Sequence, residues 1–151
     1  MKKIGLIVFG ALLMLGLTAC GEKEALTASA FKSKMETKGY EVVDITSNPE
    51  YEGVATAVLV AMKDDYQIEF YVVNDNEQSI RAYDQNKTDF EGLKESGASE
   101  TEVSLSNHAK YTLTTGGKYR VVSRIDNTFV YVDVEESKKT EVSDVLKDLN
   151  Y

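Results

Sequence analysis

The residues of this chain best suited to catalysis are a serine and the single histidine, two positions apart. Ser106 and His108 would point to the same side of a strand, because strand side chains alternate between faces. A serine nucleophile needs a base beside it and commonly sits on a sharp turn flanked by glycines. No glycine flanks Ser104 or Ser106. The segment therefore predicts an ordinary hairpin rather than a hydrolase site.

A polar stretch further upstream has part of the pattern of a calcium-binding loop. Four of its side chains have the spacing of positions 1, 3, 5 and 12 of such a loop: Asp84, Asn86, Thr88 and Glu95. Position 6, which must turn sharply and normally holds glycine, is Asp89. Tyr83 and Phe90 also continue a helical spacing of apolar residues through the stretch. We expect a solvated helix face and no metal site.

Two further patterns have simple structural explanations. Gly116 and Gly117, followed by Lys118, lack the spacing of a phosphate-binding loop and lie between two alternating segments, which predicts a tight hairpin. The nine tyrosines either line a site for a sugar or an aromatic ligand or serve as good strand residues. Since no catalytic or ligand cluster emerges, we expect no cofactor and no enzymatic activity.

The start of the chain has the pattern of an export signal. Lys2 and Lys3 precede an apolar stretch over residues 4–17, and the sequence then becomes polar directly after Cys20. That stretch is shorter than the roughly 20 residues a membrane-spanning helix needs. It is therefore read as a signal that is removed, leaving one mature domain without a disulfide, because the chain contains no second cysteine.

The segment Leu17-Thr18-Ala19-Cys20 resembles the lipobox of bacterial lipoproteins. The resemblance covers residues 1–21. It implies that residues 1–19 are cleaved, that a diacylglyceryl group is attached to Cys20, and that the lipid holds the protein on the extracytoplasmic face of the cell membrane. Residues 20–25 would then form a short tether, and residues 26–151 a single domain.

The charge of the chain limits its partners. Loss of the two N-terminal lysines takes the net charge from −8 to −10. Such a field repels phosphate backbones and anionic headgroups, so neither nucleic acid nor a second, electrostatic membrane contact is expected. Lysine outnumbers arginine 14 to 3, which is typical of an AT-rich genome and points to a Gram-positive host.

Hydrophobic periodicity predicts an α+β domain. The expected order is a helix near 27–38, strands at 41–46, 54–62 and 66–73, a helix from 75, a polar connection, four short strands between 103 and 134, and a helix from Ser137. This order predicts a mainly antiparallel sheet of six or seven strands with two or three helices. It loosely resembles that of the PsbP and Mog1 families, a likeness of element order that transfers no site.

Two short turns fix the expected pairing of the last three strands. If Gly116-Gly117 and Asp126-Asn127 are two-residue loops, one sheet face carries a partner-binding candidate set: Tyr111, Arg120, Arg124, Phe129 and Tyr131. The opposite face is more apolar and is expected under the helices, which leaves the first face outward. Arginine and tyrosine are common in binding hot spots. The alternative is that Arg120 pairs with Asp133 while the aromatics shield a solvated sheet.

These observations leave two functions from different classes. The first is a membrane-anchored, non-enzymatic domain that binds a protein or another envelope component. The second is a lipoprotein that binds a small ligand or carbohydrate in a pocket between sheet and helix. A deep apolar pocket with convergent polar groups would favour the second, and a shallow exposed surface the first. The sequence does not specify the oligomeric state.

Overall fold

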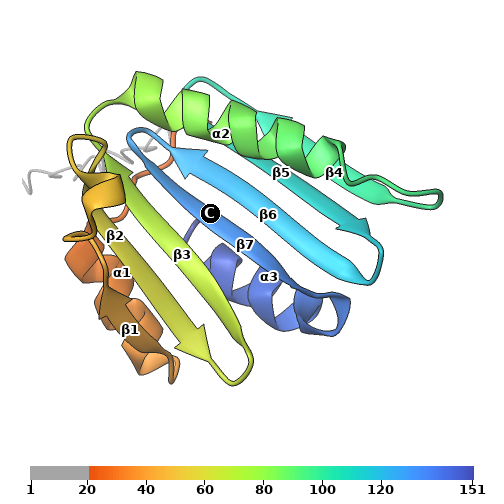
Figure 1. Ribbon diagram of the computed structural model, residues 1–151, viewed down its shortest axis with the longest axis horizontal. Coiled ribbons are helices and arrows are strands. Elements are labelled where there is room, and N and C mark those ends of the chain that lie inside the picture. Colours follow the sequence, from red (N-terminus) through yellow and green to blue (C-terminus); the bar gives the residue numbers. More distant parts are fainter. Residues whose placement is uncertain (1–20) are drawn as a thin grey trace, which may run out of the picture.

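A computed structural model describes residues 21–151 as one seven-stranded antiparallel sheet with three helices (Figure 1). The strands lie in the order β1-β2-β3-β7-β6-β5-β4. Their bounds are β1 Glu41–Asp44, β2 Ala55–Lys63, β3 Tyr66–Val73, β4 Ser99–Ser104, β5 His108–Thr115, β6 Lys118–Ile125 and β7 Thr128–Glu135. The helices are α1 Ala28–Thr37, α2 Asn76–Glu91 and α3 Lys139–Asp148. The predicted α+β class and element order are confirmed, whereas the signal and Cys20 lie outside the described residues.

Local signals account for two of the three helix starts. The Thr27 hydroxyl accepts a hydrogen bond from the Ala30 N–H at 3.1 Å, and the Asp75 carboxylate accepts one from the Gln78 N–H at 2.8 Å. Each satisfies an N–H group that a helix start leaves unpaired. The predicted start at Ser137 is wrong, because a 3-10 turn occupies Glu136–Lys138 and α3 begins at Lys139 without a side-chain cap.

Helices α1 and α3 cover one face of the sheet and enclose the larger core. Phe31 and Met35 of α1 are fully buried, and the Phe31 ring stacks on Phe70 of β3 at 4.5 Å between centroids. Helix α3 contributes a buried stripe of Val142, Val145 and Leu146, extended by Leu149 just past its end. The sheet residues expected under the helices are all in this core: Tyr119, Val121, Ile125, Val130, Val132 and Val134.

Helix α2 lies across the other face (Figure 1). Its Tyr83 and Phe90 pack with a smaller cluster on β5 and β6 that includes Tyr111, Leu113 and Val122. The sheet therefore has helices on both faces. Helix α2 packs mainly on β6, β5 and β7 and touches β3 only slightly, so the same face is left uncovered by α2 over β2 and most of β3.

Strand β4 differs from the prediction. Its segment up to Glu102 had the composition of a polar connection, but residues 99–104 pair along β5, from Ser99 opposite Thr114 to Ser104 opposite Ala109. All six residues are exposed. An edge strand exposed on both faces has no apolar alternation to reveal it, so composition alone reads it as a loop.

The sheet consists of two halves that meet along a short seam. Strand β3 pairs with β7 only from Glu69 opposite Tyr131 to Val72 opposite Thr128. By contrast, β2 and β3 pair from Lys63 opposite Tyr66 to Ala55 opposite Val73. The first residues of β3 and the last residues of β7 therefore diverge, and α3 is visible behind the opening (Figure 1).

Candidate functional site

A groove of about 540 Å³ opens where β3 and β7 diverge. Its walls are the β2–β3 turn and the start of β3 on one side, and the end of β7 and the start of β6 on the other. Asp64 forms the turn with a positive φ of 53°, a backbone region that aspartate adopts more readily than most residues. The groove lies on the face that carries α2, beyond the area that this helix covers.

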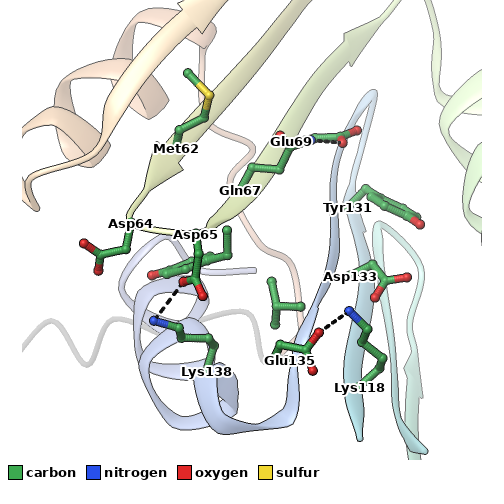
Figure 2. Close-up of a pocket in the computed structure, with 12 residues that line it drawn as sticks. Met62, Asp64, Asp65, Gln67, Glu69, Lys118, Tyr131, Asp133, Glu135 and Lys138 are labelled. Carbon is green, nitrogen blue, oxygen red and sulfur yellow. Dashed lines mark hydrogen bonds and ion pairs between the residues drawn. The ribbon is translucent and has the colours of Figure 1, made fainter. Parts of the chain in front are cut away.

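The groove is lined mainly by charged side chains (Figure 2). Five carboxylates and two ammonium groups surround it: Asp64, Asp65, Glu69, Asp133, Glu135, Lys118 and Lys138. Met62, Tyr66, Tyr131 and Val134 contribute its apolar surface. The excess of carboxylates gives the groove a net negative charge.

Most of these carboxylates have specific partners. The Lys138 ammonium lies 3.1 Å from Asp65, and the Lys118 ammonium pairs with Glu135. Arg120 Nε donates to Asp133 Oδ2 at 3.0 Å. Glu69 accepts hydrogen bonds from Gln67 at 2.7 Å and from the Tyr71 hydroxyl at 2.5 Å. Two of these contacts cross from β6 to β7, those of Glu69 lie within β3, and the Lys138–Asp65 pair joins the segment before α3 to the β2–β3 turn.

The ion pairs keep the groove charged. The hydrogen bond from Lys138 lowers the pKa of Asp65, and the bond to Asp65 in turn raises the pKa of Lys138. The hydrogen bond to Glu135 raises the pKa of Lys118 in the same way. These shifts move the pKa values of the three groups further from neutral pH. A general acid or base, by contrast, works best with a pKa near the ambient pH. The arrangement suits electrostatic recognition better than proton transfer.

The Asp65–Lys138 pair predicts a small pH-dependent effect on stability. Folding lowers the pKa of the Asp65 carboxyl from its ordinary value of 3.8. Such a group stabilises the folded chain at pH values above its ordinary pKa, and this contribution is lost as the pH falls through the lower pKa of the folded state. We expect Asp65→Asn to destabilise the protein at pH 7 and to have almost no effect at about pH 2. Urea unfolding at both pH values measures this.

The matched control is Asp64→Asn, which removes the same charge one residue away. Asp64 has no ion-pair partner within residues 21–151. An identical pH dependence in the two variants would contradict a specific role for the Lys138 pair.

The structure confirms the predicted pairing around both two-residue turns. Arg120 lies opposite Leu113 and Asp133, Tyr111 and Tyr131 lie on either side of Val122, and Arg124 lies between Ala109 and Phe129. The expectation that this face looks outward is wrong, however, because α2 packs on it. The exposed fractions are 1% for Tyr111, 8% for Arg124 and 6% for Phe129.

The five predicted residues therefore do not form one accessible surface. Arg120 makes the Asp133 pair that was the alternative interpretation, and its side chain is only 12% exposed. Tyr111 donates to Glu100 at 2.6 Å beneath α2. Tyr131 packs against Phe90 and also reaches the edge of the groove (Figure 2). Of the predicted set, Tyr131 is the residue that lines the groove.

The other sequence candidates have structural roles. Residues 84–91 belong to α2, as their helical spacing predicts, so the calcium-loop pattern is interrupted by helix. His108 Nδ1 lies 3.2 Å from the Asn107 side-chain oxygen, and the ring is mostly buried. Within residues 21–151 there is no group of three or more His, Cys, Asp or Glu side chains placed to hold a metal ion. No helix in that part of the chain is both long and apolar enough to span a membrane.

Comparisons with known proteins add little. No protein-family model matches the chain, and no curated protein matches it. Among solved structures, it is similar to the crystal structure of a GTP-binding regulator from Thermotoga maritima, with 20% identity and a TM-score of 0.49 over 83% of this chain and 88% of that one. A likeness of this kind transfers no activity and no site. The resemblance in element order to PsbP and Mog1 stays a prediction.

Proposed function

We propose that this protein is a bacterial lipoprotein, held on the extracytoplasmic face of the cell membrane through Cys20, and that it acts there as a non-enzymatic binding domain. The lipobox-like segment at residues 17–20 supports the anchoring. The open, charged groove between β3 and β7 supports the binding role. Its partner is another component of the cell envelope that carries cationic groups.

The form of the groove is the observation that favours a macromolecular partner. Small-ligand sites are mostly enclosed and apolar, with a few polar groups that orient the ligand. This groove is open to solvent, and charged side chains dominate its lining. Its ion pairs are partly exposed, as at the rims of protein interfaces. Such a surface supplies charge complementarity and steering to a large partner rather than enclosure of a small one.

The second candidate, a small-ligand or carbohydrate-binding lipoprotein, is supported by the size of the groove. About 540 Å³ lies within the usual range of ligand sites, and the rings of Tyr66 and Tyr131 form part of its wall. The predominance of charge over apolar surface makes this the weaker candidate.

Site-specific photo-crosslinking in intact cells tests the proposal. A photoreactive residue at the exposed Gln67, inside the groove, is expected to capture a partner protein or polymer. The same residue at Ser33, on the exposed side of α1, serves as the control. Equal capture at both positions would contradict a site in the groove. A low-mass adduct found at Gln67 alone would favour the small-ligand candidate.

A charge reversal tests the chemistry of the partner. Asp64→Lys is expected to weaken the Gln67 crosslink by about fivefold, since a partly exposed charge pair contributes up to about 1 kcal/mol. Glu52→Lys makes the same charge change at an exposed position outside the groove and is expected to leave the crosslink unchanged. Equal losses in both variants would point to the overall field of the protein instead.

A further inference from the structure

The first described residues are clamped to the folded domain close to the proposed lipid. The Lys23 N–H donates to the Asn107 side-chain oxygen at 3.2 Å, and the Asn107 amide donates back to the Lys23 carbonyl at 2.7 Å. The Lys23 ammonium also donates to the Asn150 carbonyl at 2.7 Å. Only Gly21 and Glu22 separate Cys20 from this clamp. Three extended residues reach about 10 Å, so the segment between Cys20 and the clamp is short.

The clamp joins a network that covers one end of the sheet. The Asp126 N–H donates to the Asn107 carbonyl at 2.8 Å, and the Ser79 hydroxyl of α2 donates to the Asp126 carbonyl. The Asn127 amide donates to the Val73 carbonyl at 2.9 Å, at the end of β3. We call this the tether end: residues 21–24, 53–54, 105–107 and 126–127. Strand β3 ends here and begins at the groove, so the two features lie at opposite ends of the sheet.

Exposed apolar side chains gather near the tether end. Among residues 21–151, seven large hydrophobic side chains are exposed, and four of them come from segments at or beside this end: Val54, Ile80, Val103 and Leu105. Val54 is 49% exposed and Leu105 is 48% exposed. Neither side chain belongs to the two cores. Apolar side chains close to a lipid tether can be buried at the boundary between the headgroups and the acyl chains.

We propose that the tether end rests on the lipid bilayer, with Leu105 and Val54 at the boundary between headgroups and acyl chains, so that the groove points away from the membrane. The inference depends on the proposed lipid at Cys20. The contact is apolar rather than electrostatic, since Glu22, Glu24 and Asp126 lie at the same end. A weak contact is enough, because the lipid holds the domain at a high effective concentration beside the bilayer.

Depth-dependent fluorescence quenching tests this orientation. The lipidated mature protein, purified from membranes, is placed in phosphatidylcholine vesicles that contain spin-labelled lipid. An environment-sensitive dye is attached to Ser106→Cys, at the tether end, or to Asp64→Cys, at the groove; Cys20 is blocked by its lipid. We expect severalfold stronger quenching at position 106 than at position 64. Equal quenching at the two positions would overturn the proposal.

Two variants test separately the apolar contact with the bilayer and the clamp at Lys23. Leu105→Ser, at an exposed position, is expected to reduce the quenching at position 106 without changing the melting temperature. Asn107→Ala opens the clamp and is expected to shrink the difference between positions 106 and 64, while Asn86→Ala, which removes an amide within α2, leaves it intact. Unchanged quenching in both Leu105→Ser and Asn107→Ala would also overturn the proposal.

The mass of the N-terminal peptide distinguishes a failure of the proposed anchoring from a failure of the proposed orientation alone. A Cys20 peptide without lipid would remove the proposed anchoring and this orientation together. A lipidated protein with equal quenching at both positions would overturn the orientation alone, and crosslinking at Gln67 would still report on the groove.

Discussion

Replacement of Cys20 by alanine is expected to shift the protein from the membrane fraction to the medium or to an uncleaved precursor. The reason is that the proposed anchor is a diacylglyceryl group on this thiol, and two acyl chains hold a protein stably where a single chain is marginal. Fractionation of cells fed with radiolabelled fatty acid measures the effect. The label should appear on the wild-type chain and disappear from the variant.

Ser33→Ala, at an exposed position of α1, is the matched control for a change in a small side chain. It should partition and label as the wild type does. Unchanged partitioning of Cys20→Ala, together with no fatty acid on the wild-type chain, would show that the lipobox-like segment is not used.

Truncation of Leu146 to alanine is expected to cost about 2–4 kcal/mol of unfolding free energy. Leu146 is fully buried in the core beneath α3, so the change removes apolar contacts and leaves a cavity. Chemical denaturation measures the loss. Lys147→Ala, one residue further along the same helix and exposed, should change stability by less than about 0.5 kcal/mol.

Removal of α3 should have a larger effect than Leu146→Ala. Truncation after Ser137 deletes the buried stripe and also Tyr151, which is 2% exposed and lies edge-on to Phe70. A truncated chain that melts at the wild-type temperature would show that the helix is dispensable.

Short-range signals predicted much of the fold. The loops Gly116-Gly117 and Asp126-Asn127 each join strands that are neighbours along the chain, so turn type alone sets the opposing residues. The pairs Arg120 with Asp133 and Tyr111 with Val122 follow directly. The Thr27 and Asp75 caps were predictable for the same reason, because each depends on residues three positions apart.

The covering of the second face was not predicted, although part of the signal for it lies in the strands. Helix α2 was predicted from its spacing, but a stripe on a helix does not say which sheet face receives it. The strands carried a signal in favour of burial, since Leu113, Tyr111 and Val122 share the face taken as outward. On β6, Val122 lies on this face while Val121 and Ile125 lie on the opposite one, and apolar side chains on both faces of a strand indicate cover on both sides.

The groove depends on the least local pairing in the sheet, which explains why it was missed. Strands β3 and β7 are joined by no turn, and α2 and three other strands intervene between them. No local sequence signal, such as a turn, therefore indicates where the pairing of β3 and β7 ends. The acidic side chains at strand ends, Asp64, Asp65 and Glu135, were visible in the sequence, but at strand ends they resemble ordinary turn residues.

The seam between the two halves has a consequence for the order of folding. The β2–β3 hairpin and the β4–β7 meander can each form from strands that follow one another, whereas Glu69 meets Tyr131 only after a long loop closes. Closing that loop costs chain entropy before any seam contact is gained. Residues of α1 and α3 share one core with both halves, so their packing accompanies the closure. We therefore expect the groove to take shape late in folding, together with the closure of the seam.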